Sequence, residues 1–191
     1  MTWLPNLLTL SRIVMLLPVM GLLAETDSAD YRWAFALFLA AGLTDLVDGW
    51  AARRLNCVSN VGAFLDPLAD KIMSNVLLVF LACRYPAWIP LWMVLLLLAR
   101  EFAVQGFRSM APCLGVMIRT ERLSKLKTLF QLIAAGAVIA GLGWESLSTI
   151  AAPVALTSLI LALASGYISM TTIFIRNADL WSRRPLDMES R

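Results

Sequence analysis

The sequence contains no histidine, and only 15% of its 191 residues are charged, whereas soluble domains carry about 25% charged residues. The absence of histidine removes the most frequent general base of enzymes and the most frequent side-chain ligand of transition metals. The three cysteines lie far apart and form no Cys-x-x-Cys pair, so neither a zinc site nor a dithiol redox motif is indicated. We interpret them as small buried apolar residues.

Apolar residues make up 60% of the chain, and the mean hydropathy is +0.75. The apolar runs are continuous rather than alternating, which favours membrane-spanning helices over strands. Segments of ~20 apolar residues are long enough to cross a hydrocarbon core of ~30 Å. We expect a single all-α integral membrane domain over residues 1–191, with six transmembrane helices at 10–24, 31–50, 62–83, 88–107, 128–144 and 148–175.

Basic residues are distributed unevenly between the two sides of this predicted bundle. With six spans, both termini and the turns after the second and fourth spans fall on one side. Of the 16 basic residues, only Arg32 and Arg84 fall on the other side. The positive-inside rule therefore predicts that both termini are cytoplasmic.

The N-terminus lacks the basic region of a signal peptide. We therefore expect it to be retained, with residues 5–11 as a short interfacial segment. No transit peptide is recognised either, which favours a bacterial inner membrane.

Four carboxylates gather where the second predicted span ends and the third begins. Asp45 and Asp48 are three residues apart, and Asp66 and Asp70 are four apart, so each pair lies on one face of its helix. Four carboxylates at one membrane depth cannot all stay ionised without cations. Because the available ligands are hard oxygen atoms, Mg²⁺ or Mn²⁺ fits this set, and Ca²⁺ is possible. Two cations held in this way are typical of enzymes that displace a phosphoryl group.

Small residues and one arginine accompany these acids. Gly49, Ala52 and Gly62 leave room for close approach of a ligand, and Arg53 offers planar donors suited to phosphate oxygens. A purely structural interpretation is also open, in which basic neighbours neutralise the acids and the glycines end helices. For the whole set, we favour the ligand site.

The string D-x-x-D-G-x-x-A-R, a spacer over 54–61, and then G-x-x-x-D-x-x-x-D resembles the signature of the CDP-alcohol phosphatidyltransferases. The resemblance extends over nearly the whole chain. It implies a homodimer with its active site at the cytoplasmic membrane face. It further implies the following roles: two divalent cations on Asp45, Asp48, Asp66 and Asp70, the cytidine nucleotide on Gly49, Ala52, Arg53 and Gly62, and Asp70 as the general base.

The motif indicates a CDP-linked lipid as donor and leaves the acceptor open. A basic cluster follows the fourth predicted span, with members Arg108, Arg119, Arg122, Lys125 and Lys127. It fits either cytoplasmic topology and anionic headgroups or an acceptor that carries a phosphate. We expect Glu101 to pair with a nearby arginine and to have a structural role.

Four short elements, PNLLTLSR, ARE-F, G-F-R and K-x-K-T-x-x-Q, resemble the family members that use glycerol 3-phosphate as acceptor. By that resemblance, Arg108, Lys125 and Lys127 contact its phosphate. One departure is Ser124, because many members have glycine there.

We therefore expect phosphatidyl transfer from CDP-diacylglycerol to glycerol 3-phosphate, with membrane lipids and no nucleic acid as partners. Phosphatidylglycerol, inositol phosphate or serine is an alternative acceptor. Two further classes also use membrane acids. A divalent-cation transporter would carry them nearer the bilayer midplane, and a membrane prenyltransferase is larger, with more widely separated acidic motifs.

Overall fold

The computed structural model describes residues 3–55, 71, 74–111 and 122–178, and it describes side chains for 14–43, 71, 74–111 and 123–178. Within these ranges the chain is helical and contains no strand, which confirms the all-α class. The helices are α1 (Trp3–Ala24), α2 (Ser28–Leu55), a helix over Ser74–Arg84, α4 (Leu91–Met110), α5 (Arg122–Gly143) and α6 (Glu145–Arg176).

Several helix boundaries differ from the predicted spans. Helix α1 begins at Trp3, so the segment expected at the membrane surface is continuous with the first span. Helix α2 continues to Leu55, although a turn was expected from residue 51. The reason is that alanine, arginine and leucine are strong helix formers, and they occupy residues 51–55. The carboxylate pair on α2 therefore lies within a helix rather than at its end.

Two helices of the described residues are long and apolar enough to cross a membrane, Leu123–Gly143 and Glu145–Arg176. Val14–Ala24 and Ser74–Arg84 are shorter apolar helices. Apolar side chains also face outward, including Leu17 (68% exposed), Phe102 (74%) and Ile175 (70%). An outer surface of this kind is typical of a protein surrounded by lipid or by partner chains. The number of spans and the orientation of the termini stay predictions.

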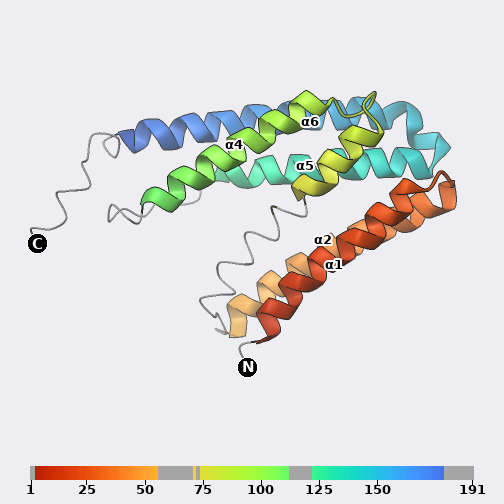
Figure 1. The fold of residues 1–191 in the computed structure, drawn as a ribbon, viewed down its shortest axis with the longest axis horizontal. Coiled ribbons are helices and arrows are strands. Elements are labelled where there is room, and N and C mark those ends of the chain that lie inside the picture. Colours follow the sequence, from red (N-terminus) through yellow and green to blue (C-terminus); the bar gives the residue numbers. More distant parts are fainter. Residues whose placement is uncertain (1–2, 56–70, 72–73, 112–121, 179–191) are drawn as a thin grey trace, which may run out of the picture.

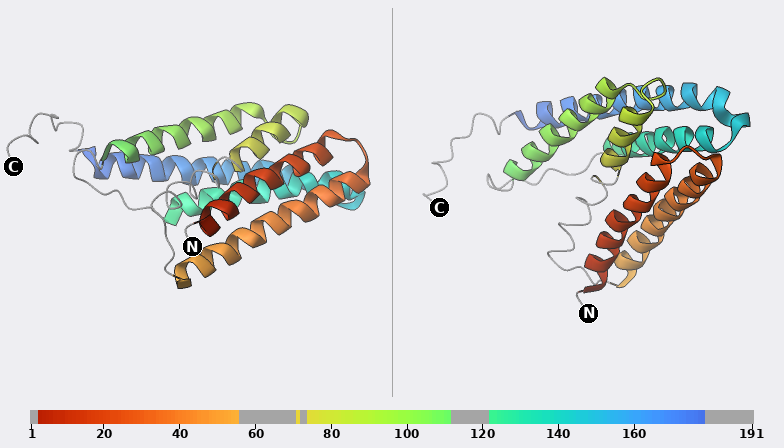
Figure 2. Two further views of the ribbon diagram at one scale, coloured as in Figure 1. Left: turned by 60° about the horizontal axis from the view of Figure 1, so that its bottom comes forward. Right: turned by 45° about the vertical axis from the view of Figure 1, so that its right-hand side comes forward.

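Figure 1 shows the arrangement of the helices. Helices α4, α5 and α6 run alongside one another, and α1 and α2 form a hairpin that packs obliquely on α5 through α2. The α1–α2 loop and the α5–α6 turn lie at one end of the bundle. The N-terminal end of α1, the C-terminal end of α2 and the N-terminal end of α5 lie toward the other end, as Figure 2 also shows. Short turns join α1 to α2 and α5 to α6, so the two helices of each pair are antiparallel.

Small residues bring α5 and α6 together. A Cβ atom at Gly141 would collide with Ala151 on α6 and with the ring of Trp88. Further along α6, the buried positions include Ala155, Ala162 and Ser169. Small side chains at helix interfaces permit the close backbone approach on which packing between membrane helices depends.

The loop end is held by tyrosine and arginine hydrogen bonds to backbone carbonyls. The hydroxyl of Tyr85 lies 3.2 Å from the carbonyl oxygen of Leu23 and 3.2 Å from the hydroxyl of Tyr31. Arg32 Nε donates a 2.9 Å bond to the carbonyl oxygen of Gly143. Burial and the hydrogen bond with Tyr31 raise the pKa of Tyr85 to about 12, because both favour its neutral form.

The expectation that all cysteines are buried is wrong for Cys83, which is free and exposed. Cys83 lies next to the last residue of the helix over Ser74–Arg84, directly after buried Leu81 and Ala82. A thiol is tolerated there because a small apolar side chain is as compatible with an outward apolar surface as with the core. Cys57 and Cys113 lie outside the described residues.

Candidate functional site

Helix α2 carries the first half of the predicted site. Asp45 and Asp48 lie three residues apart on this continuous helix, so the backbone places them on one face. Gly49, Ala52 and Arg53 follow on the same helix. The side chains of these five residues lie outside the described part of the structure. Gly62, Asp66 and Asp70 lie outside the described residues altogether.

The predicted metal ligands fit hard cations by their chemistry, since all four are carboxylates. Among the described side chains, no group of three or more His, Cys, Asp or Glu residues occurs. The metal site therefore stays a prediction on Asp45, Asp48, Asp66 and Asp70.

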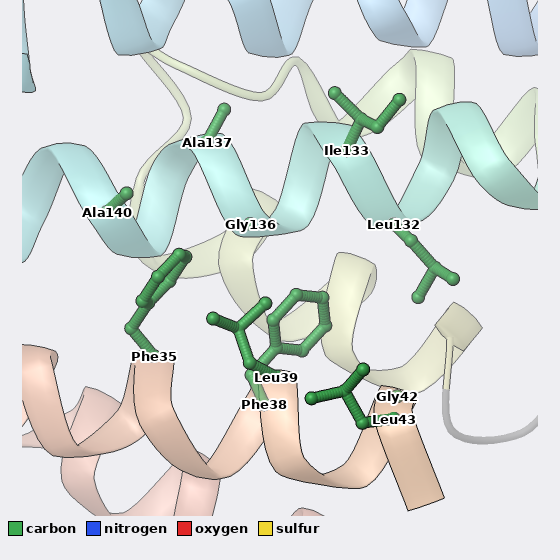
Figure 3. A pocket seen from close by; sticks show the side chains of 10 residues that line it. All are labelled: Phe35, Phe38, Leu39, Gly42, Leu43, Leu132, Ile133, Gly136, Ala137 and Ala140. Carbon is green, nitrogen blue, oxygen red and sulfur yellow. The ribbon is translucent and has the colours of Figure 1, made fainter. Parts of the chain in front are cut away.

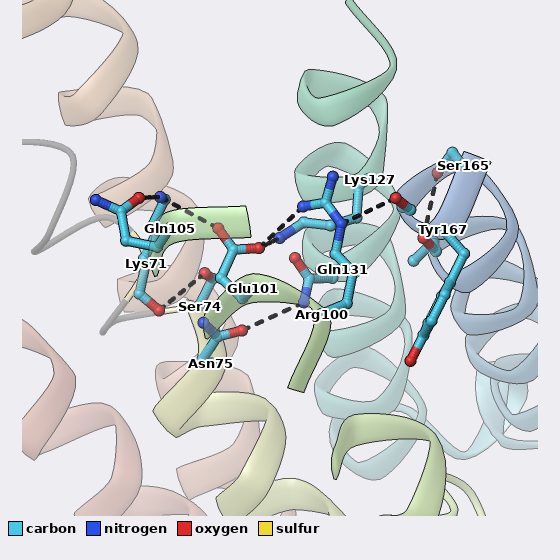
Figure 4. A network of polar contacts seen from close by, with 12 residues as sticks. Lys71, Ser74, Asn75, Arg100, Glu101, Gln105, Lys127, Gln131, Ser165 and Tyr167 are labelled. Carbon is cyan, nitrogen blue, oxygen red and sulfur yellow. Dashed lines mark hydrogen bonds and ion pairs between the residues drawn. The ribbon is translucent and has the colours of Figure 1, made fainter. Parts of the chain in front are cut away.

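A polar cluster surrounds Glu101 on α4, and we call it the Glu101 cluster: Lys71, Arg100, Glu101 and Lys127. Figure 4 shows its side chains converging from three parts of the chain. Glu101 Oε1 lies 3.3 Å from Lys71 Nζ, and Oε2 lies 3.4 Å from Arg100 Nη1. Lys127 Nζ on α5 also contacts Oε2. The expected pairing of Glu101 with an arginine is confirmed for Arg100, and the two lysines are additional partners.

The members of this cluster differ in their access to the surface. The side chains of Arg100 and Lys127 are 1% and 4% exposed, that of Glu101 is 12% exposed, and that of Lys71 is 30% exposed. Three cations surround one carboxylate, so the cluster carries an excess of positive charge. An excess of this kind at low exposure favours the binding of an anion.

Contacts with α4 and α6 hold the cations of the cluster. Lys71 Nζ donates a 2.7 Å bond to Gln105 Oε1, one helical turn beyond Glu101. Arg100 Nε donates a 2.9 Å bond to the carbonyl oxygen of Gly166 on α6. A Cβ atom at Gly166 would lie 3.4 Å from Lys127 Cγ, which is ordinary van der Waals contact, so the stem of Lys127 passes directly beside this glycine.

The three predicted acceptor residues occupy different environments. Lys127 is buried within the Glu101 cluster, whereas Lys125, two residues earlier on α5, is exposed. Arg108 is half-buried in the last turn of α4. Its Nε and Nη2 atoms are buried, and neither has a hydrogen-bond partner among the described residues. Unpaired buried guanidinium atoms are costly, so Arg108 is suited to receive an anion.

The sequence interpretation missed a second polar contact beside the cluster. Gln131 Nε2 donates a 3.3 Å bond to Asn75 Oδ1, which joins α5 to the helix over Ser74–Arg84 (Figure 4). Gln131 is 1% exposed. It lies four residues after Lys127, so helical spacing could have placed both on one face. Glu101 and Gln105 have the same spacing, which places both on one face of α4.

An apolar groove lies between α2 and α5 (Figure 3). Its volume is about 510 Å³, and its lining residues on α5 include Leu132, Gly136 and Ala140. On α2 the lining extends to Gly42 and Leu43, which precede Asp45 by less than one helical turn. The groove therefore leads along α2 toward the predicted metal ligands.

Comparison with known proteins agrees with the motif. The family model for CDP-alcohol phosphatidyltransferase matches residues 2–174. A Bacillus subtilis (strain 168) protein named CDP-diacylglycerol–glycerol-3-phosphate 3-phosphatidyltransferase is 38% identical over 149 residues, which cover 71% of this chain and 76% of the relative. Proteins of the same name are 36% identical in Rickettsia typhi (72% and 76% covered) and 35% identical in Escherichia coli strain K12 (68% and 72% covered). This chain belongs to the CDP-alcohol phosphatidyltransferase family.

Proposed function

We propose that this protein transfers the phosphatidyl group of CDP-diacylglycerol to glycerol 3-phosphate, giving phosphatidylglycerophosphate and CMP. The observation that carries the proposal is the match to relatives bearing the name of that activity, which extends over about 70% of the chain. The cationic excess of the Glu101 cluster supports it independently, because an acceptor with a phosphate needs positive charge that a serine acceptor does not.

In the proposed reaction, Asp70 accepts the proton of the primary hydroxyl of glycerol 3-phosphate. The resulting oxygen attacks the phosphorus that bears diacylglycerol, the bond from that phosphorus to the bridging oxygen breaks, and CMP leaves with that oxygen. Two divalent cations, Mg²⁺ or Mn²⁺, bound by Asp45, Asp48, Asp66 and Asp70 would neutralise the charge of the diphosphate. The remaining contribution of the protein is to orient the two reactants.

The donor would be held at two places along α2. Gly49, Ala52 and Arg53, together with Gly62, would receive the cytidine nucleotide. The groove between α2 and α5 would receive one acyl chain, since its lining is apolar and it ends close to Asp45 on the same helix. A lipid donor anchored in this way presents its diphosphate at the predicted cation site.

The acceptor phosphate would be held by Arg108, Lys125 and Lys127. The unpaired buried atoms of Arg108 support this role, and so does the excess positive charge around Lys127. The exposed position of Lys125 suits a residue that meets a soluble substrate on its way to the site. Bidentate contact from an arginine and point contacts from lysines are the usual means of phosphate recognition.

The remaining features of the proposal concern the surroundings of the enzyme. The protein would be a homodimer in the bacterial inner membrane, with six spans, cytoplasmic termini and a cytoplasmic active site. Two observations support this topology. Two helices are long and apolar enough to cross a membrane, and both the start of α1 and the end of α6 lie away from the α5–α6 turn (Figure 1).

The test is an assay of the purified protein with CDP-diacylglycerol, Mg²⁺ and radiolabelled glycerol 3-phosphate. We expect label in the organic phase and release of CMP. Absence of label with glycerol 3-phosphate, combined with turnover of serine, inositol phosphate or phosphatidylglycerol, would reassign the acceptor. Metal flux into proteoliposomes without lipid synthesis would show that the protein is a transporter and not this enzyme.

A further inference from the structure

We propose that Glu101 is a positioning residue for the transfer reaction. Its carboxylate holds both Lys127 and Lys71, and Lys71 directly follows Asp70 in the sequence. This inference rests on the proposed function. It goes beyond the sequence interpretation, in which Glu101 had a structural role alone.

The two carboxylate oxygens of Glu101 contact different lysines. Oε1 contacts Lys71 Nζ at 3.3 Å, and Oε2 contacts Lys127 Nζ. A carboxylate accepts hydrogen bonds on both oxygens at once. Glu101 on α4 therefore joins two segments that are 56 positions apart, because Lys71 is on one and Lys127 is on the other (Figure 4).

Those two segments lead to two different parts of the predicted site. Lys71 is the next residue after Asp70, the predicted base. Lys127 is one of the predicted ligands of the acceptor phosphate. The hydroxyl to be deprotonated and the phosphate to be held belong to the same small molecule. The separation of base and phosphate ligand must therefore match that molecule.

The support that Glu101 provides is also rigid. Glu101 is only 12% exposed, and Lys71 is additionally bonded to Gln105 on the same helix at 2.7 Å. Arg100 also contacts Glu101 and is bonded at 2.9 Å to α6. A carboxylate that is mostly buried and contacts three cations has little freedom to move. Charge-assisted hydrogen bonds of this kind are stronger than neutral ones.

A carboxylate beside a phosphate-binding lysine would otherwise be unfavourable, because it repels the ligand. Its presence is accounted for if three cations leave a positive excess for the phosphate, while the carboxylate orients them. Glu101 then holds Lys127 ready for the acceptor.

The experiment compares Glu101→Gln, Glu101→Asp and the wild type at varied glycerol 3-phosphate and varied CDP-diacylglycerol. Glutamine preserves the size of the side chain and removes its charge. We expect Glu101→Gln to raise the KM for glycerol 3-phosphate by ~10-fold or more, the size of effect that loss of a charge-assisted hydrogen bond produces. The KM for CDP-diacylglycerol should stay within ~2-fold, and Glu101→Asp should recover part of the loss.

The matched control is Arg32→Met, which removes a cationic tie between helices at the opposite end of the bundle. It should lower the Tm and leave both KM values unchanged. A second measurement places Glu101→Gln in a Lys127→Met background. There it should raise the KM for glycerol 3-phosphate by less than it does alone, since one lysine that it orients is already gone.

Three outcomes would overturn the inference while the wild type is active: unchanged KM values in Glu101→Gln, equal increases for both substrates, or a lower KM for glycerol 3-phosphate. A lower KM would mean that Glu101 competes with the phosphate. An inactive wild type would instead refute the proposed function, so the two failures are distinguishable. If Glu101→Gln fails to fold, the same split of KM values is measured in Glu101→Asp, and its absence there overturns the inference.

Discussion

Arg100 Nε on α4 donates a 2.9 Å hydrogen bond to the carbonyl oxygen of Gly166 on α6. The arginine is 1% exposed and also contacts Glu101. It therefore links the packing of two helices to the charge of the Glu101 cluster. A neutral residue at this position would leave the cluster with one cation fewer and α6 with an open carbonyl.

The Arg100–Gly166 contact predicts a large effect on stability. Arg100→Met should destabilise the folded protein by about 3 kcal/mol, as removal of one partner from a buried charge pair does. Arg100→Lys should recover little of this, because a lysine cannot reproduce the planar geometry of the guanidinium. Thermal unfolding in detergent measures both variants. A Tm within one degree of the wild type for Arg100→Met would contradict the structural role assigned to this contact.

Asp70 is predicted to be both a ligand of a cation and the general base. Asp70→Asn should lower kcat by ~100-fold or more, since it removes the group that accepts the proton. The rate of lipid product formation at saturating substrates measures this change, and Asp30→Asn, in the first turn of α2 at the other end of the bundle, is the control with unchanged kcat. Near-normal turnover in Asp70→Asn would assign the base to another residue.

The groove between α2 and α5 predicts selective damage to donor binding. No atom lies within 4 Å of a Cβ built at Gly42, and Gly42 lines the groove, so Gly42→Leu has room for its Cβ and adds a side chain at the groove. It should raise the KM for long-chain CDP-diacylglycerol by ~10-fold, the loss expected when several buried methylene groups are displaced. Donors with short acyl chains should be affected less.

Gly21→Leu on α1 is the matched control for the groove, because a Cβ at Gly21 is equally uncrowded and Gly21 does not line it. That variant should leave the KM for the donor unchanged. If Gly42→Leu raised the KM for long-chain and short-chain donors equally, the proposal that the groove binds an acyl chain would be contradicted.

Tyr85 predicts a stability change at high pH. Its folded pKa is raised from 10.0 to about 12, so the folded state holds the phenolic proton more tightly than the unfolded state does. The resulting stabilisation is complete below pH 10 and is lost as the pH rises through about 12. Tyr85→Phe should therefore show a weaker loss of Tm than the wild type between these values. An identical pH dependence for both proteins would contradict this prediction.

The all-α class could be predicted from the sequence because apolar runs of membrane length report directly on helices. The boundaries were less accurate, as at residues 51–55, where a polar turn was expected and α2 continues to Leu55. Polar composition alone indicated the turn, whereas the intrinsic helix propensity of those residues prevailed. Cys83 was assigned to the interior because a cysteine outside any metal or redox motif was interpreted as a small buried apolar residue, and the same apolar character also suits the outward position that it occupies.

The Glu101 cluster could be predicted only in part. Neighbouring positions in sequence indicated that Glu101 meets an arginine, and Arg100 does so. The contacts with Lys71 and Lys127 depend on how three helical segments pack, which no local pattern encodes. Lys125 and Lys127 were treated alike in the sequence interpretation. In the structure Lys125 is exposed and Lys127 is buried, because the helix turns by about 200° over two residues. The carboxylate motif, in contrast, was recognisable because its chemistry demands fixed spacings.

The most direct test follows two labels through one turnover. The donor is CDP-diacylglycerol with radiophosphorus in the phosphate next to diacylglycerol, and the acceptor is tritiated glycerol 3-phosphate. The proposed reaction predicts that both labels enter one lipid in equal amounts while unlabelled CMP is released. Radiophosphorus that stays out of the tritiated lipid, or a wild-type enzyme that incorporates no tritium, would contradict phosphatidyl transfer to glycerol 3-phosphate.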